Sequence, residues 1–147
     1  MDSLAKRFED AGVRYLLIGG QAVRLHGLPR FSMDWDFFIP PRSTDNFGKI
    51  EQALGGELDV DLLPLGDRGE NIIQSYPTQF GFIQFHLVVP GLPSFEASDA
   101  KAVHLVDENG ASFRCVSAED LLAAKLAANR IQDQQDILFL REKLRLT

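Results

Sequence analysis

The spacing of hydrophobic and polar residues predicts that short helices and strands alternate along this chain. At the start, Leu4, Phe8 and Ala11 recur at the spacing of one helix face, and Gly12 follows as a stop signal. Elsewhere, short apolar runs bounded by glycine or proline favour strands. The predicted strands are residues 13–18, 33–39, 58–63, 72–76, 80–89, 103–106 and 112–116. The predicted helices are residues 4–11, 21–26, 44–54 and 93–100, and two C-terminal helices that include residues 121–126 and 137–144.

Both C-terminal helices are preceded by the spacing of a capping box. Ser117 and Asp120 are three residues apart, so the serine side chain can accept a hydrogen bond from the backbone N–H of Asp120. Asp133 and Asp136 repeat this spacing, and we expect Asp133 to cap the final helix with support from Asp136. We also expect Arg130 to form an ion pair with Asp133, three residues further along the chain.

The order of these elements predicts one α+β domain spanning residues 1–147. Strands and helices alternate in the first part of the chain, strands dominate the middle, and two helices end it. A chain of 147 residues is long enough to bury a core, and its 45% hydrophobic content is typical of a folded protein. We therefore expect a short mixed sheet with helices mainly on one face and a C-terminal helical pair.

Charge and cysteine content limit the possible partners. The chain has 15 Lys and Arg against 21 Asp and Glu, a net charge of −6, so we expect no generic nucleic-acid binding. Its single cysteine, Cys115, excludes an intrachain disulfide and a zinc site built from cysteines. The first ten residues lack the apolar core of a signal peptide, and no apolar run reaches membrane-spanning length. We expect a cytoplasmic protein without a membrane partner.

Two aspartates in the strand predicted at residues 33–39 are the main candidates for chemistry. Successive side chains of a strand point to opposite faces, so Asp34 and Asp36 project together while Met33, Trp35 and Phe37 project toward the core. Two carboxylates on one face repel each other unless a cation lies between them. Mg²⁺ prefers carboxylate oxygens and commonly keeps waters and substrate phosphates as its other ligands. The pattern therefore predicts a divalent metal site.

A pair of glycines supplies the matching half of a nucleotide site. Gly19 and Gly20 follow a predicted buried strand and precede a predicted helix. Glycine lets the backbone approach a phosphate closely, and the N-terminal amides of a helix favour an anion. Each motif alone has a simpler explanation, as a turn or as a solvated strand edge. Their occurrence in this order favours a site that binds a nucleotide phosphate and a metal.

Residues 16–36, which run from Leu16-Leu17-Ile18-Gly19-Gly20 to Asp34-Trp35-Asp36, resemble the signature of the polymerase-β-type nucleotidyltransferase superfamily. Residues 117–140 also resemble the C-terminal pattern of its small bacterial branch, which includes minimal nucleotidyltransferases and toxin–antitoxin and abortive-infection components. The resemblance implies a nucleotidyltransferase-like fold. It implies that Gly19 and Gly20 hold the triphosphate of an NTP, that Ser32 orders the turn, and that Asp34 and Asp36 bind metal.

The chain departs from this family at one position. Members of the superfamily use a third carboxylate on a later strand, and the matching position here is His86, which shares a predicted strand face with Gln84. Four interpretations of His86 remain open at this point: a general base, a ligand of a softer metal such as Mn²⁺ or Zn²⁺, a residue of a site that only binds, or a half-buried structural histidine. A second Asp-x-Asp pair, Asp59 and Asp61, could supply the missing carboxylate, but we expect it to be a solvated strand face.

Transfer of a nucleotidyl group develops negative charge on phosphate oxygens, so a cation should face the site. Lys125, which lies among leucines in a predicted helix, and Arg30, just before the aspartate strand, are the candidates, with Arg24 as a further one. Lys125 is equally compatible with a surface lysine. For Arg130, contact with a phosphate is the less favoured alternative to its ion pair with Asp133. We expect metal-dependent transfer of a nucleotide from an NTP to a hydroxyl of a protein, RNA or small molecule. The alternative is a degenerate binding module, such as a toxin–antitoxin component with a partner protein.

Overall fold

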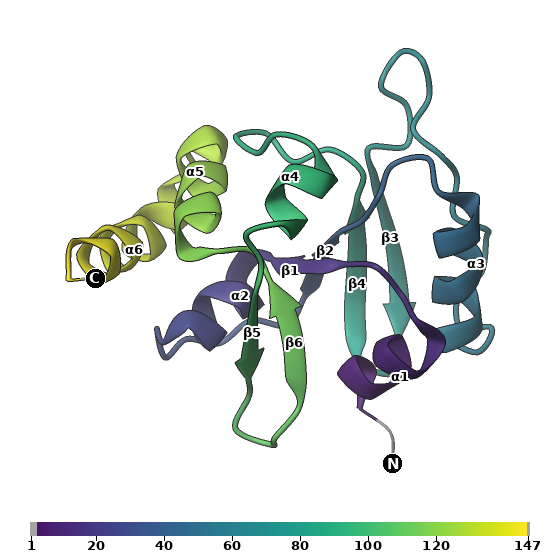
Figure 1. Cartoon of the computed structure of the whole chain (residues 1–147), viewed down its shortest axis with the longest axis horizontal. Helices are drawn as coiled ribbons and strands as arrows, with labels where there is room; N and C mark the ends of the chain where they lie inside the picture. The colour runs from purple at the N-terminus through teal and green to yellow at the C-terminus, as the bar shows by residue number, and fades with distance from the viewer. Residues whose placement is uncertain (1–2, 147) are drawn as a thin grey trace.

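The computed structural model describes residues 3–146 and has a mixed sheet at its centre, flanked by helices (Figure 1). The strands are β1 (Leu16–Ile18), β2 (Trp35–Phe38), β3 (Ile73–Thr78), β4 (Gly81–His86), β5 (Val103–Val106) and β6 (Ser112–Cys115). The helices are α1 (Leu4–Ala11), α2 (Gly19–His26), α3 (Thr44–Ala53), α4 (Phe95–Asp99), α5 (Ala118–Ala128) and α6 (Gln134–Arg145), with a 3₁₀ turn at Ile131–Asp133.

The six strands lie in the order β3-β4-β2-β1-β6-β5. β1 pairs antiparallel with β2 and parallel with β6, and β2 pairs parallel with β4. The edge strands β3 and β5 each form an antiparallel hairpin with the neighbouring strand. The centre of the sheet is therefore built from β1, β2 and β4, the three strands that carry or border the predicted site.

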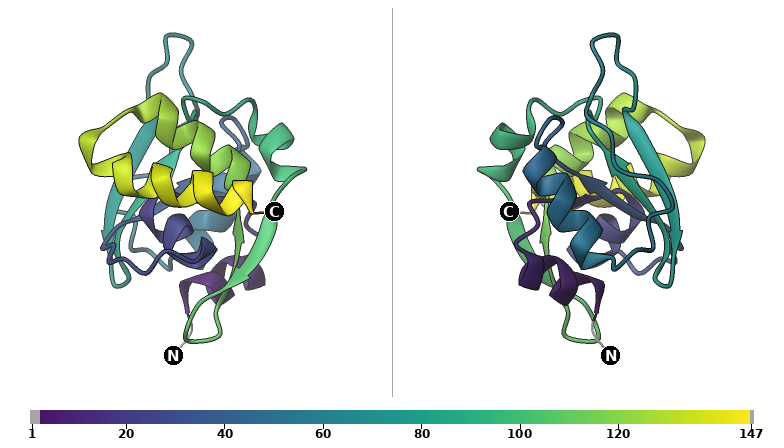
Figure 2. Two further views of the ribbon diagram at one scale, coloured as in Figure 1. Left: turned by 90° about the vertical axis from the view of Figure 1, so that its left-hand side faces the viewer. Right: turned by 90° about the vertical axis from the view of Figure 1, so that its right-hand side faces the viewer.

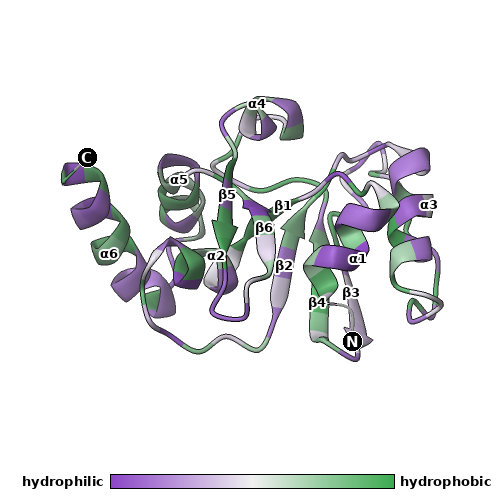
Figure 3. Ribbon diagram, turned by 60° about the horizontal axis from the view of Figure 1, so that its bottom comes forward, coloured by the Kyte–Doolittle hydropathy of each residue, from purple (hydrophilic) through white to green (hydrophobic). Residues whose placement is uncertain are grey.

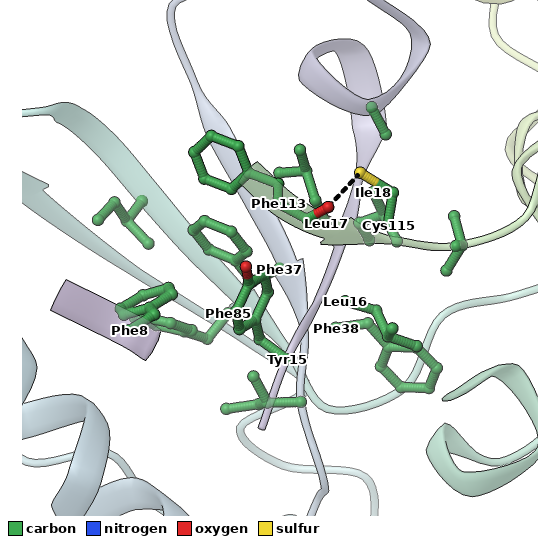
Figure 4. Packing of buried hydrophobic residues seen from close by; sticks show 14 of the residues in the cluster. Phe8, Tyr15, Leu16, Leu17, Ile18, Phe37, Phe38, Phe85, Phe113 and Cys115 are labelled. Atoms are coloured by element: carbon green, nitrogen blue, oxygen red, sulfur yellow. Dashed lines mark hydrogen bonds between the residues drawn. The ribbon is translucent and has the colours of Figure 1, made fainter. Parts of the chain in front are cut away.

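Aromatic side chains fill the core on one face of the sheet (Figure 4). Phe37 of β2 contacts Phe8 of α1 with ring centroids 5.1 Å apart, and Tyr15 at 5.3 Å. Its strand neighbour Phe38 points to the other face and contacts Phe95 of α4 at 5.5 Å. Helices therefore lie against both faces, and Figure 3 shows α1, α3 and α6 banded with polar and apolar residues, as expected for helices that are half exposed.

The two C-terminal helices, α5 and α6, lie side by side (Figure 2). Helix α5 also packs against α2, and Lys143 of α6 donates a hydrogen bond to the backbone oxygen of His26 at the end of α2. A Cβ atom on Gly27 would lie 3.4 Å from the ring of Phe139, so α6 also approaches the turn after α2. These contacts hold the helical pair against the element that follows Gly19 and Gly20.

The predicted fold class is confirmed, including the mixed sheet and the C-terminal helical pair. Helices cover both faces of the sheet, however, and not mainly one as predicted. The strand predicted at residues 58–63 is wrong. The backbone N–H of Leu62 is hydrogen-bonded to the Glu51 side chain, and that of Leu63 to the Gln74 side chain, so these donors are satisfied without a strand partner. Among residues 3–146, no helix is long and apolar enough to cross a membrane.

The capping predictions have different outcomes. Ser117 caps α5 as predicted, because its hydroxyl accepts a hydrogen bond from the backbone N–H of Asp120 at 3.1 Å. The prediction that Asp133 caps α6 is wrong, since its backbone is already helical and its side chain makes no capping hydrogen bond. Its carboxylate instead accepts hydrogen bonds from Lys125 and Arg130. Asp133 is buried, so its negative charge needs these positive partners. The expected pair of Arg130 with Asp133 is confirmed.

Candidate functional site

A cleft of about 570 Å³ lies over the ends of β1 and β2, next to β4 and α5. Its lining includes all but one of the residues predicted for the site: Gly19, Gly20, Arg30, Ser32, Asp34, Asp36, His86 and Lys125, with Arg24 the exception. The apolar part of the lining consists of Ile18, Ile72, Ile73, Val88, Val89, Pro90, Leu121, Ala124 and Ala128. The cleft therefore combines a charged region with an aliphatic region.

The paired aspartates enter the cleft from β2 and from the residues just before it. Asp36 lies within β2, level with Ile18 of β1 on one side and with Gln84 of β4 on the other. Asp34 precedes the strand and is exposed, whereas Asp36 is half buried. Both line the same cleft, so the two acids share the site although only Asp36 belongs to the regular strand.

Gly19 brings the backbone into contact with the Asp36 carboxylate. A Cβ atom on Gly19 would lie 2.6 Å from Oδ2 of Asp36, and the φ angle of Gly19 is +72°. Any larger residue would therefore collide with the carboxylate and also strain the backbone. The helix α2 begins directly at Gly19, and the preceding residue, Ile18, provides no side-chain cap. The first N–H groups of α2 are thus available to an anion beside Asp36.

Gly20 has a related role toward Arg30 and Ser32. A Cβ atom on Gly20 would lie 3.0 Å from the Ser32 hydroxyl oxygen and 3.2 Å from Nη2 of Arg30. The missing side chain thus lets the Arg30 guanidinium lie close to the diglycine backbone. The positive charge of Arg30 and the start of α2 face the same part of the cleft.

Replacing Gly19 by alanine tests this close approach. We expect the free energy of unfolding to fall by about 1–2 kcal/mol, because alanine in a left-handed conformation is strained and its methyl group displaces the Asp36 carboxylate. Calorimetry should show NTP affinity reduced at least about tenfold, a loss of about 1.4 kcal/mol. The matched control is Gly48→Ala in α3, where a Cβ atom would meet nothing within 4 Å. That control should leave NTP affinity unchanged, and equal effects of the two substitutions would contradict the role of Gly19.

His86 is fixed against Asp36. Its Nε2 lies 2.8 Å from Oδ1 of Asp36, and both side chains project from the same face of the sheet. A donated N–H from the imidazole orients the carboxylate, as partners of metal-binding carboxylates commonly do. The position of the missing third acid is thus occupied by a partner of the second acid.

A buried group of charges forms one wall of the cleft. Nζ of Lys125 lies 3.1 Å from a carboxylate oxygen of Asp133 and 3.1 Å from one of Asp136, and all three side chains are almost fully buried. Arg130 donates two hydrogen bonds to Asp133, at 2.8 and 3.0 Å. Arg30 donates one to Asp136 at 2.5 Å. Three cations therefore surround two carboxylates, which leaves one positive charge in excess on this wall.

Neighbouring cations keep Asp133 ionised. Burial alone would raise the pKa of its carboxyl group, but the hydrogen bonds from Arg130 and Lys125 outweigh burial and hold the pKa below its usual value. The same contact with Asp133 raises the pKa of Arg130, and the charge of Asp36 contributes in the same direction. Asp133 and Arg130 therefore stay charged near neutral pH.

The sequence did not identify some residues of the cleft. Gln84, Arg130, Gln132 and Asp133 line it, although the sequence favoured a structural role for Arg130 and Asp133 over contact of Arg130 with a phosphate. The sequence signal that could have placed Arg130 and Asp133 in the cleft is their position just after the helix that carries Lys125 among leucines. Arg24 lies outside the lining and donates to Glu108 and Gln21. Asp59 and Asp61 also lie outside it, at exposed positions.

The acids of the cleft suit a metal that shares its ligands with a substrate. Within residues 3–146, no group of three or more His, Cys, Asp or Glu side chains is arranged to hold a metal alone. Asp34 and Asp36 provide two hard oxygen-donor side chains in one cleft. Mg²⁺ typically binds through one or two carboxylates together with phosphate oxygens and waters. The donor set therefore fits such an ion, with phosphate completing the site.

Comparison with known proteins supports the same fold. The crystal structure of ANT(2")-Ia in complex with adenylyl-2"-tobramycin superposes with a TM-score of 0.64 at 14% identity, covering 96% of this chain and 85% of that one. A putative nucleotidyltransferase from Thermotoga maritima gives a TM-score of 0.54 at 12% identity, covering 98% of this chain and 89% of that one. No curated protein sequence matches the chain. The family described as "Nucleotidyl transferase AbiEii toxin, Type IV TA system" matches residues 4–141, and the chain therefore belongs to this nucleotidyltransferase family.

Proposed function

We propose that this protein is a metal-dependent nucleotidyltransferase that moves a nucleotide from an NTP to a hydroxyl group of an acceptor. The observation that carries the proposal is the contact between Asp36 and the bend at Gly19 and Gly20, which we name the diglycine bend. This contact places a backbone that can bind phosphate beside a carboxylate that can bind a metal. Membership of the AbiEii family supports the same reaction class.

In this proposal, different residues of the cleft bind different parts of the NTP. The first N–H groups of α2, at Gly19 and Gly20, bind the triphosphate, and Arg30 adds a positive charge over Gly20. Ser32 keeps the loop before β2 in place through its hydroxyl, which lies 3.3 Å from the backbone oxygen of Asp34. Lys125 and Arg130 contribute the excess positive charge of the cleft wall, which favours the charge that develops on phosphate oxygens during transfer.

Asp34 and Asp36 would hold the divalent metal, with Mg²⁺ as the expected ion and Mn²⁺ as an alternative. When bound, such an ion neutralises charge on the phosphate oxygens and so assists displacement at phosphorus. His86 orients the Asp36 carboxylate through the 2.8 Å contact. In this assignment His86 is a positioning residue, and two acids supply the protein ligands where the superfamily uses three.

The substitution at His86 also favours a second candidate function. Asp133 also lines the cleft but is bonded to Lys125 and Arg130, so only Asp34 and Asp36 remain for a metal. A protein with two such acids can bind an NTP and a metal without transferring the nucleotide. The protein would then act as a nucleotide-binding module, for example with a partner protein of a toxin–antitoxin system. The family name supports a toxin role, and we place both candidate activities in the cytoplasm, where NTPs are available.

The two candidates differ in whether a labelled product forms. We expect titration calorimetry with each NTP to show binding that depends on Mg²⁺ or Mn²⁺. We also expect incubation with α-labelled NTPs and a cell extract to give a labelled acceptor. In His86→Asn, transfer should fall about 10–100-fold with smaller effect on NTP affinity, as expected for a residue that orients a metal-binding carboxylate. Metal-dependent binding without any labelled product would favour the binding module, and absence of NTP binding would reject both.

A further inference from the structure

An ion pair between Arg30 and Asp136 connects the last helix of the protein to the start of α2. Arg30 lies between α2 and β2, and its Nη1 donates a hydrogen bond of 2.5 Å to Oδ2 of Asp136 on α6. The Asp136 side chain is 3% exposed, whereas the Arg30 side chain is 30% exposed and lines the cleft. The carboxylate is therefore the buried end of this pair, and the guanidinium is the end that a ligand can reach.

The rest of the Arg30 guanidinium lies beside the diglycine bend. A Cβ atom on Gly20 would lie 3.2 Å from both Cζ and Nη2 of Arg30. In the part of the chain that the structure describes, the Arg30 side chain has no hydrogen-bond partner other than Asp136. An arginine side chain has five N–H donors, so most of those of Arg30 remain available to an anion at the start of α2.

Helix α6 also contacts the other end of α2. Lys143 donates a hydrogen bond to the backbone oxygen of His26, the last residue of α2. Asp136 and Lys143 are two helical turns apart on α6, about 10 Å, which is close to the length of α2 from Gly20 to His26, about 9 Å. Side chains of α6 thus reach α2 near both of its ends, so the position of Asp136 relative to Gly20 does not depend on Arg30 alone.

The Asp136 carboxylate has two opposite effects on an anion in the cleft. An unrestrained arginine side chain has about 2 kcal/mol of rotamer entropy, part of which is lost when it binds a ligand. Asp136 restrains the guanidinium before the ligand arrives, and such preorganisation strengthens binding. On charge alone, a negative carboxylate near the cleft weakens the binding of an anion. Since the two effects differ in sign, an experiment can show which one is larger.

We propose that Asp136 is a positioning residue that holds the Arg30 guanidinium over the diglycine bend, oriented to bind the triphosphate of the NTP. This inference rests on the NTP binding of the proposed function, and it holds whether or not the nucleotide is transferred. One N–H group of Arg30 is held by Asp136, and the N–H groups that remain bond to phosphate oxygens. The preorganising effect of Asp136 is thus larger than its repulsion of the anion.

Replacing Asp136 with asparagine tests the sign of the effect. The ligands are inorganic tripolyphosphate and the NTP that wild-type protein binds most tightly, each titrated with Mg²⁺ by calorimetry. We expect both Kd values to rise about tenfold, although the variant has one negative charge fewer. The matched control is Asp120→Asn, which alters a buried aspartate that pairs with Lys101 outside the cleft lining, and it should change neither Kd more than about twofold. An unchanged or lower Kd in Asp136→Asn would overturn the inference.

A double-mutant cycle shows whether Asp136 acts through Arg30. Arg30→Gln alone should raise both Kd values about tenfold, and the addition of Asp136→Asn should raise them by less than about twofold more. Independent effects would multiply to about 100-fold in the double variant and would overturn the positioning role. A loss of affinity for NTP but not for tripolyphosphate would place Arg30 on another part of the nucleotide, which also contradicts the inference.

Arg30→Lys tests the same geometry without altering a buried group, so it decides the matter if Asp136→Asn is unfolded in circular dichroism. Lysine keeps the positive charge but lacks the planar fork through which one guanidinium can bond to a carboxylate and to a phosphate. We expect the Kd for tripolyphosphate to rise at least about fivefold. A Kd equal to that of wild type would show that only the charge of Arg30 matters, and the role of Asp136 would be rejected.

Failure of the proposed function gives a different result. If wild-type protein binds neither NTP nor tripolyphosphate, the proposed function is rejected, and the role of Asp136 with it. If wild-type protein binds both ligands and the Asp136 and Arg30 variants bind them equally well, the proposed function stands and only the positioning role is rejected.

Discussion

Replacing Asp36 with asparagine is expected to lower the rate of nucleotidyl transfer at least about 100-fold, since even outer partners of metal ligands commonly contribute 10–100-fold. Asparagine keeps the shape of the side chain but removes the negative charge that a divalent cation requires. It also changes the partner of His86 Nε2, which lies 2.8 Å from Oδ1 in the native protein. NTP affinity in the presence of Mg²⁺ should fall as well, and calorimetry together with transfer of an α-labelled nucleotide measures both effects.

The chain contains a matched control for this substitution. Asp61 belongs to a second Asp-x-Asp pair, but it is exposed and lies outside the cleft lining. Asp61→Asn removes the same charge from the protein and should leave transfer and NTP affinity near their wild-type values. Circular dichroism should show both variants folded. A fully active Asp36→Asn would remove the metal site from the proposed mechanism, whatever its effect on stability.

Replacing Lys125 with methionine is expected to destabilise the protein by about 3 kcal/mol, at the lower end of the range for removal of one partner of a buried ion pair. Methionine fits the length of the lysine side chain but leaves Asp133 and Asp136 without their shared cation. Arg130 still contacts Asp133, and Arg30 still contacts Asp136, which keeps the loss below the upper end of that range. Most of the loss of stability comes from the buried carboxylates of Asp133 and Asp136, which remain in place with fewer positive partners.

Equilibrium unfolding in urea at pH 7 measures this effect. The control is Lys49→Met, which removes a lysine from an exposed pair with Asp45 on α3 and should cost less than about 0.5 kcal/mol. A Lys125 variant as stable as the Lys49 variant would show that the charged wall of the cleft contributes no stability. In that case its positive charges would be retained for binding alone.

Much of the fold, and the position of Asp34 and Asp36 in one cleft, were predictable from short local patterns. Alternation along residues 33–39 correctly placed Asp36 on the face opposite the core residue Phe37, and the two glycines correctly marked the end of β1. The prediction that Met33 projects toward the core is wrong, because β2 begins only at Trp35 and Met33 is exposed. Serine at the start of a helical pattern predicted the cap at Ser117. These features depend on residues close together in the sequence, so the sequence alone contains the relevant information.

Features that depend on distant residues were not predictable in the same way. The Asp133–Asp136 spacing is compatible with a capping box. In the folded chain, however, Arg30 and Lys125 lie close to these carboxylates, which form ion pairs with them and do not cap the helix. Residues 58–63 were predicted as a strand but do not form one, because the side chains of Glu51 and Gln74 accept hydrogen bonds from two of the backbone N–H groups of this segment.

The wall of the cleft has a consequence for the order in which parts of the chain can fold. The diglycine bend and both acids are made within the first quarter of the chain, but the carboxylates that hold Arg30 and Lys125 belong to residues 133 and 136, close to its end. Arg30 and Asp136 are 106 residues apart in the sequence, so their contact can form only after the segment that contains Asp136 has been synthesised and α6 has docked. Pairing of β1 with β2 needs only residues near the start of the chain, so the centre of the sheet can form well before the charged wall of the cleft.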